Sequence, residues 1–450
     1  MARILWVACA EPGSLYPAVP LALELARRGH EITVLCEPAS RPMFEGLGLA
    51  FRPCRALTRH LHTFNRDEHA DRRAALGAWY AGCVRSLYED TSNELRREDY
   101  DAALIDPLEP GADFAAEAAG VPFISYVHWR MRETGLDTWF WFRIWDRMSS
   151  GAASFVDWWN AQRALVGLGP EPRPPEQHVW YRTSPDLTLI LGLPELAADD
   201  VLLPPSALRV GPTNWDPPLE QPLPDWVETL GRERPAMLAA ISTVGDGDGE
   251  LVRGVAAVAR TENVDVVLTA ADSSEVPSLP SNVRVTPFIP HGVLLPRLSA
   301  VVSHAGNGIV TRAACAGVPL LLIPGGKDQP EVARGAAAAG IAIVLERERA
   351  DAERTREAIR TLLGQTRYRL RAQEVARRAK AYDAASVAAD ATERLLSRNV
   401  RRRNARSRFR RATRPCQLRT AGQSEPRHEN PAQAELFIAG AGFEPATSGL

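Results

Sequence analysis

Apolar and polar positions follow a strand, helix, strand order over the first 38 residues. Segments 4–9 and 32–36 are short apolar runs of the kind that form buried parallel strands. Segment 18–28 between them has apolar residues at helical spacing, and Gly29 follows as a helix C-cap. The pattern predicts a βαβ unit, and the turn between strand and helix lacks GxGxxG, which argues against a dinucleotide cofactor here.

The same alternation recurs in two groups along the chain. The first group continues with apolar runs at 102–105 and 121–126, which enclose a helical pattern ending at residue 119. The second group has strand-like runs at 237–241, 264–269, 283–285, 300–303, 320–323 and 343–345, and helical patterns at 356–363, 368–379 and 384–396. Alternating strands and helices in both groups predict an α/β protein with two doubly wound Rossmann-like domains that face each other across a cleft.

A proline-rich segment separates the two groups. Residues 212–224 read PTNWDPPLEQPLP, which is typical of an interdomain linker. We therefore expect an N-terminal domain over residues 1–211, a linker over 212–234 and a C-terminal domain over 235–397.

Composition limits the class of protein. The chain has 450 residues, too many for one core, with 45% apolar and 24% charged residues, as in ordinary globular proteins. A formal net charge of −2 argues against bulk nucleic-acid binding. The six cysteines lack CxxC spacing, and the chain shows neither signal-peptide segments nor an apolar run near 18 residues, so we expect a cytoplasmic protein with reduced cysteines.

The character of the sequence changes after residue 397. Nine arginines lie between Arg398 and Arg414, followed by polar, Gly- and Pro-rich chain to Leu450. We expect residues 398–450 to form a disordered tail, with a nucleic-acid or anionic-lipid patch as the alternative. The Gly-Phe-Glu-Pro at 442–445 is what the consensus T-arm of a transfer-RNA gene would encode, so we also hypothesise that the reading frame runs past the true end into neighbouring DNA.

The most informative stretch is 303–330, SHAGNGIVTRAACAGVPLLLIPGGKDQP. An apolar strand ends in a turn with little side-chain bulk, and a helix is expected to start near Asn307. Backbone N–H groups at such a helix start form an anion site, for which a nucleotide diphosphate is the usual ligand. Asp328 and Gln329 follow the next buried strand, at the carboxyl edge where open α/β sheets bind ligands.

This stretch, together with Phe288-Ile289-Pro290-His291, resembles the donor-binding signature of GT-B nucleotide-sugar glycosyltransferases of the macrolide and UDP-glucuronosyl type. Four motif pieces occur in order: aromatic-x-P-H, HxGxx, GVP and P-x-x-x-D-Q. The resemblance covers roughly residues 1–397 and implies that the first domain binds the acceptor and the second the donor. It also implies a nucleotide-sugar co-substrate, UDP- or dTDP-linked, with no cofactor and no metal.

The resemblance assigns donor-binding roles to residues of this chain. His304 and the backbone at Gly306, Asn307, Gly308 and Ile309 would hold the diphosphate, with Ser242 and Thr243 nearby. Phe288 would stack on the base, the backbone near His291 would read its edge, and Asp328 and Gln329 would bind sugar hydroxyls. Each has a structural alternative: a helix N-cap for Ser242 and Thr243, core packing for Phe288, and a solvated helix start for Asp328 and Gln329. The family usually has Ser or Thr at position 309 and often Glu at 312, where this chain has Ile309 and Arg312.

The N-terminal domain departs from the family at its expected general base. The family's first turn commonly reads G-H-x-x-P, and here Ser14 takes the place of the histidine. We expect Ser14 and Asp106 at the catalytic position, with Asp106 acting directly or through a water; the alternative for Asp106 is a turn-initiating Asp-Pro. Four histidines could substitute for the missing base, although each also fits an ordinary structural role: His60, His62, His69 and His128.

The acceptor side is defined only by its aromatic residues. Six tryptophans fall between 129 and 159, and the resemblance places this region at the acceptor pocket, with Trp129, Trp139 and Trp141 as candidate contacts. Dense aromatics suit a flat or greasy small molecule; helix packing and a peripheral membrane contact are the alternatives. We expect a glycosyltransferase that acts on a hydroxyl of a hydrophobic small molecule, and the resemblance implies inversion at the sugar. A catalytically impaired relative that binds nucleotide sugars or lipids is the alternative.

Overall fold

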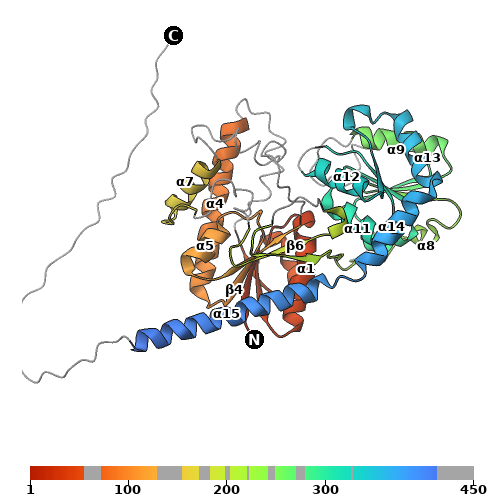
Figure 1. Cartoon of the computed structure of the whole chain (residues 1–450). Coiled ribbons are helices and arrows are strands. Elements are labelled where there is room, and N and C mark those ends of the chain that lie inside the picture. Colours follow the sequence, from red (N-terminus) through yellow and green to blue (C-terminus); the bar gives the residue numbers. More distant parts are fainter. Residues whose placement is uncertain are drawn as a thin grey trace, which may run out of the picture. The chain divides into compact units, whose positions relative to one another are not determined.

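The computed structural model describes most of the chain as one compact unit, Met1–Arg401. The described residues are 1–54, 72–128, 155–171, 183–197, 203–219, 222–241, 249–269, 279–325 and 328–412. Within them the chain forms two parallel sheets with helices, which confirms the expected α/β class (Figure 1).

The first sheet has seven strands in the described residues, in the order β3-β2-β1-β4-β5-β6-β7, all parallel. The strands are β1 (Arg3–Val7), β2 (Glu31–Cys36), β3 (Ala50–Pro53), β4 (Ala102–Ile105), β5 (Phe123–Val127), β6 (Leu187–Leu191) and β7 (Ala207–Gly211). Its helices are α1 (Pro12–Arg27), α2 (Arg41–Gly46), α4 (Arg72–Arg97), α5 (Ala112–Ala119) and α7 (Phe155–Leu165). The strand order reverses between β1 and β4, so ligands are expected beyond the carboxyl ends of these two strands.

The second sheet repeats this order as β10-β9-β8-β11-β12-β13, again all parallel. Its strands are β8 (Ala236–Ala240), β9 (Asp265–Thr269), β10 (Val283–Thr286), β11 (Ala300–Ser303), β12 (Leu320–Leu322) and β13 (Ala342–Val344). The helices are α8 (Trp226–Thr229), α9 (Gly249–Thr261), α10 (His291–Leu294), α11 (Asn307–Ala316), α12 (Gln329–Ala338), α13 (Ala352–Gly364) and α14 (Thr366–Ala379). The equivalent reversal lies between β8 and β11.

Each sheet is buried on both faces, which explains the continuous apolar runs in its central strands. One face of the first sheet packs Ile4 and Trp6 against α1, and the other packs Leu5 and Val7 against α4 and α5. Parallel sheets covered by helices on both sides read as apolar runs rather than as alternating patterns. Strands β3 (AFRP) and β7 (ALRVG) lie at the edges of the first sheet and carry polar residues, so the apolar pattern did not predict them. Strand β6 (LTLIL) has a nearly continuous apolar run, but the sequence analysis did not include it.

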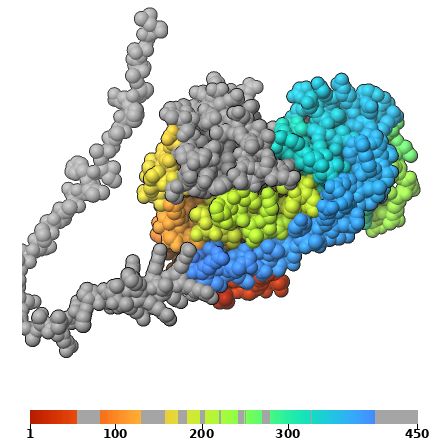
Figure 2. All heavy atoms as spheres, viewed as in Figure 1, coloured from red at the N-terminus to blue at the C-terminus, as the bar shows by residue number. Residues whose placement is uncertain are grey.

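The last helix, α15 (Ala384–Ala412), returns to the first sheet. Its residues Ala384, Ala388 and Leu395 belong to the core built around β1 and α1. In Figure 2 the blue atoms of α14 and α15 form a continuous band that reaches the yellow-green atoms of the first sheet's last strands. The helix continues past residue 397, where the folded part was expected to end, and residues 413–450 of the expected tail lie outside the described residues.

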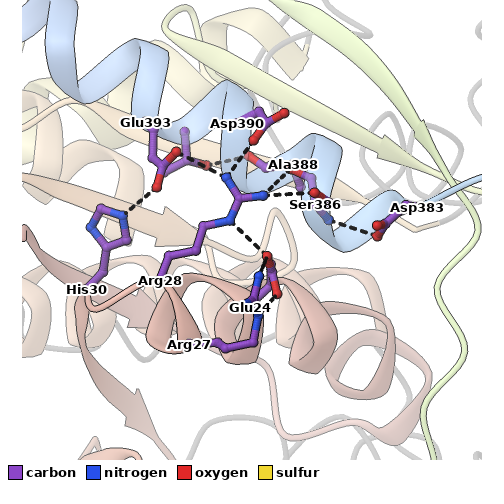
Figure 3. Close-up of polar contacts among 10 residues, drawn as sticks. Glu24, Arg27, Arg28, His30, Asp383, Ser386, Ala388, Asp390 and Glu393 are labelled. Atoms are coloured by element: carbon purple, nitrogen blue, oxygen red, sulfur yellow. Dashed lines mark hydrogen bonds and ion pairs between the residues drawn. The ribbon is translucent and has the colours of Figure 1, made fainter.

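Charged side chains fix α15 to the end of α1 (Figure 3). Arg28 donates to Asp390 at 2.5 Å, to Glu393 at 3.1 Å and, within its own helix end, to Glu24 at 2.8 Å. His30 contacts the other oxygen of Glu393 at 3.1 Å. We call these five residues the α1–α15 clasp. Because Asp390 and Glu393 lie more than 360 positions after Arg28, the clasp ties α15 to the N-terminal part of the chain.

Candidate functional site

The turn between β11 and α11 has an unusual backbone. Ala305 has φ of 69°, in the left-handed region that a residue with a side chain rarely adopts. Such a conformation costs on the order of 1 kcal/mol or more and persists only where its surroundings hold it. Ala305 is fully buried, and its N–H donates to Ser303 Oγ at 3.1 Å, so the core and the strand end hold the turn in this shape.

Gly306 allows the ring of His304 to lie over the start of α11. A Cβ at position 306 would stand 2.7 Å from His304 Nε2, closer than real contacts permit. A side chain at position 306 would therefore push the imidazole aside, and glycine lets the ring lie beside the first turn of α11. Helix α11 makes its first backbone bond from Val310 N–H to Gly306 C=O at 3.1 Å.

The first turn of α11 presents backbone rather than side chains. N–H groups in a helix's first turn have no partner within the helix, and they carry the positive end of its dipole. Gly308 is exposed with open space around its Cβ direction, whereas the Ile309 side chain is buried in the core. Ile309 thus serves packing through its side chain and leaves only its amide to the site, which explains how an apolar residue can stand where the family has a hydroxyl.

Phe288 and His291 lie on the loop that links β10 to α10. Phe288 is 52% exposed, an unusual degree for a phenyl ring, and its carbonyl accepts a bond from Thr286 Oγ1 at 3.0 Å. The core-packing alternative for Phe288 does not match this exposure. His291 begins α10, where burial first and the charge of Arg312 second lower its pKa to about 4, so it is neutral near pH 7.

Asp328 and Gln329 begin α12, after the strand β12. Asp328 is the N-cap residue, and its carbonyl accepts the first helical bonds from Glu331 and Val332. Gln329 is buried, and its Oε1 accepts from Gly325 N–H at 2.8 Å. That bond fixes the turn leading to α12 and leaves the Nε2 group of Gln329 as a donor.

The guanidinium of Arg312 contacts residues 215 and 216 of the proline-rich segment. It pairs with Asp216 and donates to the Trp215 carbonyl at 3.1 Å. The other oxygen of Asp216 accepts from Gly292 N–H at 3.0 Å, and the Trp215 ring packs edge-on against Tyr16 of α1, with centroids 5.2 Å apart. The sequence did not predict this connection, because an acidic residue within a proline-rich linker carries no local sign of its partner.

Ser14 and His128 form a hydrogen-bonded pair at the carboxyl edge of the first sheet. Ser14 lies in the first turn of α1, directly after β1, and His128 follows β5. Their Oγ and Nε2 atoms are 2.9 Å apart, and Ser14 is 3% exposed. Burial lowers the pKa of His128 to about 3, so its imidazole is neutral near pH 7. In the sequence analysis, His128 was only one of four histidines that could replace the missing base. Its position directly after a buried strand was the signal that could have singled it out.

Asp106 follows β4 and belongs to a buried hydrogen-bond network that links β1, β4 and β5. Its Oδ2 accepts from Tyr126 OH at 2.9 Å and its Oδ1 from Leu108 N–H at 2.8 Å. The Tyr126 oxygen in turn accepts from Trp6 Nε1 at 3.3 Å. Asp106 has no exposed surface at all, so it orients neighbouring groups and offers no open face to an acceptor in this structure.

A second carboxyl group, Glu109, is buried one turn beyond Asp106. Burial, and next the negative charge of Asp106, raise the pKa of Glu109 to about 8, while a hydrogen bond with Cys9 opposes the rise. Glu109 is therefore largely protonated near pH 7. The carboxyl edge of the first sheet thus combines the carboxyl group of Asp106, the largely protonated carboxyl group of Glu109 and the neutral imidazole of His128.

The two edges meet at His128. Asn307, the first residue of α11, donates from its Nδ2 to the His128 carbonyl, and helices α1 and α11 are in contact (Figure 1). This bond brings the turn between β11 and α11 next to the Ser14–His128 pair of the first sheet. Several predicted site residues lie outside the described residues: Ser242, Thr243, Trp129, Trp139, Trp141, His60, His62 and His69.

Among the residues that the structure describes, no three His, Cys, Asp or Glu side chains gather so as to hold a metal ion. Likewise, no helix in the described ranges is long and apolar enough to cross a membrane.

Known proteins are similar to this chain in sequence. Residues 253–394 match the family model of the erythromycin biosynthesis protein CIII-like C-terminal domain. The chain is 28% identical over 438 residues to 4'-demethylrebeccamycin synthase of Lentzea aerocolonigenes, covering 88% of this chain and 100% of that protein. A 194-residue match, 28% identical, covers 43% of this chain and 42% of the PGL/p-HBAD biosynthesis rhamnosyltransferase of Mycobacterium bovis (strain BCG / Pasteur 1173P2).

Solved structures share the fold. The glycosyltransferase VinC, crystallised in complex with dTDP, superposes with a TM-score of 0.66 at 25% identity over 88% of this chain and 100% of VinC. The glycosyltransferase of kitacinnamycin superposes with a TM-score of 0.70 at 21% identity, over 88% of this chain and 99% of that one. Two parallel sheets in this arrangement are the GT-B fold. The chain is therefore a glycosyltransferase with the GT-B fold, and it is similar to macrolide-type members of that class.

Proposed function

We propose that this glycosyltransferase moves the sugar of a dTDP- or UDP-linked donor to a hydroxyl group of a hydrophobic small molecule, with inversion at the sugar and without a metal ion. The observation that carries the proposal is the turn before α11, where a left-handed Ala305 and a close Gly306 place His304 beside the open backbone of the helix start. Charge that develops on a departing diphosphate would be held there by N–H groups and an imidazole.

The remaining donor residues take the roles that their positions support. Phe288, with its exposed ring, stacks on the nucleobase, and the backbone at His291 faces the base edge. Asp328 and the free Nε2 of Gln329 bind sugar hydroxyls at the start of α12. The family resemblance alone assigns Ser242 and Thr243 to the diphosphate and Trp129, Trp139 and Trp141 to the acceptor, because all five lie outside the described residues. The dTDP complex of VinC and the secondary-metabolite name of the Lentzea relative support the donor and acceptor classes.

Inversion follows from a single in-line displacement. The acceptor oxygen attacks the anomeric carbon from the face opposite the diphosphate, the carbon–oxygen bond to phosphate breaks, and a base removes the acceptor proton. The positive end of α11 and His304 supply the charge compensation that a metal ion gives in other transferases.

The test is sugar transfer by the purified chain. The protein is incubated with UDP- and dTDP-sugars, each with and without a library of hydrophobic alcohols and phenols, and with and without EDTA. We expect nucleotide release that depends on acceptor, a product heavier by one sugar, inverted configuration by NMR, and no effect of EDTA. Donor binding without release would instead support the non-catalytic relative, for which Ser14 at the base position and the complete burial of Asp106 are the motivating observations.

A further inference from the structure

The Ser14–His128 pair is a hydroxyl and an imidazole in direct hydrogen-bond contact, brought together by the fold. Their atoms are 2.9 Å apart although the residues are 114 positions apart in the sequence. Ser14 stands in the first turn of α1, and His128 stands at the carboxyl end of β5, one strand away from β4 in the sheet. Contacts of this kind convert a weakly acidic serine into a group that can pass on a proton.

The neighbours of the pair place it at the junction of donor and acceptor. The His128 carbonyl accepts from Asn307, the first residue of the helix whose start forms the anion site. On the other side, the buried Tyr126–Asp106 bond fixes the strand that precedes His128, and the Tyr126 and His128 rings lie 6.4 Å apart. The pair is therefore held by strands of the first sheet and by the donor helix of the second.

We propose that Ser14 and His128 form a proton relay for the acceptor hydroxyl. In this relay the acceptor O–H proton passes to Ser14 Oγ while the Ser14 proton passes to His128 Nε2. The acceptor oxygen forms its bond to the anomeric carbon as the bond from that carbon to the diphosphate oxygen breaks, and the diphosphate leaves with the electron pair. His128 then carries the proton and releases it to water after product departs.

Two observations favour His128 over Asp106 as the proton's destination. Asp106 has no exposed surface and already accepts one bond at each oxygen, whereas Ser14 contacts His128 directly. Serine alone does not suffice, because a hydroxyl is a poor base near neutral pH and must hand its proton on. Burial keeps the imidazole neutral, with a lone pair that can accept the proton, but it also disfavours the imidazolium, and the negative charge of the departing diphosphate would offset this cost.

The relay rests on the proposed function. It also predicts that the rate depends on the acidity of the acceptor, which a purely structural role would not predict. A base matters most for acceptors whose hydroxyl is weakly acidic, and least for acceptors that ionise easily. Ser14→Ala, His128→Gln and the double variant are compared with wild type on 4-ethylphenol and 4-nitrophenol, together with the alcohols that wild type accepts. In all three variants, we expect kcat for 4-ethylphenol and the alcohols to fall about 10²-fold with little change in KM. For 4-nitrophenol, we expect kcat to fall less than about 10-fold.

Further measurements separate the relay from a loss of fold. The double variant is expected to be no slower than the slower single variant, because the two groups act as one unit. Ser14→Thr keeps the hydroxyl and is expected to retain most activity. Calorimetry with dTDP should give the same affinity in every variant. His30→Gln is the matched control, since His30 is another histidine in a polar contact but precedes β2, at the opposite edge of the same parallel sheet.

The possible failures are distinguishable. If the variants lose the same factor on weakly and strongly acidic acceptors, or if the two single losses multiply in the double variant, the relay is wrong while sugar transfer stands. If wild type transfers no sugar to any acceptor, the proposed function fails and the relay falls with it.

Discussion

The two sheets of this protein have the same strand order and a ligand edge at the same point, yet they form their sites by different means. In the second sheet, the proposed donor site lies in one short turn, 304–308, which combines a left-handed alanine with a glycine in close approach to His304. In the first sheet, the equivalent edge relies on side chains from different strands: Ser14, Asp106, Glu109, Tyr126 and His128. The comparison teaches that a backbone site is local in the sequence, whereas a side-chain site is assembled by the sheet.

The backbone site should give the largest effect when it is broken. His304→Ala is expected to lower kcat/KM by about 10²-fold or more, because a donor aimed at the leaving diphosphate is lost. Steady-state kinetics and dTDP calorimetry measure the change. An unaltered kcat/KM would remove His304 from the site.

Gly306→Ala separates the backbone from the imidazole. Its new Cβ would collide with His304 Nε2, so the ring must move, and we expect a loss of about 10-fold or more in kcat/KM. Gly364→Ala is the matched control, because Gly364 ends α13, does not have a left-handed backbone, and its Cβ would meet nothing within 4 Å. Equal behaviour of the two variants would contradict the close-approach argument.

The side chains at the carboxyl edge of the first sheet should affect the free energy of unfolding as well as the reaction rate. The folded-state pKa of Glu109 is raised from 4.5 to about 8, so the unfolded chain loses this proton at lower pH than the folded one. Its contribution to stability is complete below about pH 4.5 and is lost as pH rises to about 8. Glu109→Gln removes this loss. In denaturant titrations, the free energy of unfolding of the variant relative to wild type should therefore rise by about 2–4 kcal/mol from about pH 5 to about pH 8.5.

A surface carboxylate provides the control for that measurement. Glu45 pairs with Arg41 on an exposed part of α2, with 54% of its side chain accessible. Glu45→Gln should show no comparable divergence from wild type between the two pH values. A pH-independent difference for Glu109→Gln would mean that Glu109 is already ionised in the folded protein.

The smallest expected effect concerns the clasp that joins the chain's end to the first sheet. Arg28→Ala should lower Tm and speed hydrogen exchange in α15, since Arg28 contacts Asp390, Glu393 and Ser386 of that helix. Arg27→Ala is the matched control, because Arg27 contacts only Glu24 of its own helix among its hydrogen bonds in the described residues and is 71% exposed. The difference between the variants should shrink at high salt. Equal exchange rates in α15 would show that apolar packing alone holds it.

Much of the fold was predictable because its signals are local. The continuous apolar runs at β4 and β11 gave their limits correctly, and the helices α13 and α14 followed from apolar spacing. The edge strands β3 and β7 were missed, because polar residues on an edge strand obscure the apolar run on which the prediction depends. The role of Arg312 could not be inferred either, since its partner Asp216 lies in another segment and ion pairing leaves no periodic trace.

By itself, the sequence determined the class of fold and the place of a turn with little side-chain bulk before α11, because apolar periodicity and turn residues are local signals. Only the tertiary structure decided which side chains meet. Ser14 and His128, Asp106 and Tyr126, and Arg28 and Glu393 are separated by 114, 20 and 365 positions respectively. Parallel strand order brings the first two pairs together, and the packing of α15 against α1 brings the third together. The physical reason is that a side chain's partner depends on which strands lie side by side, and that order is fixed by the packing of the whole sheet.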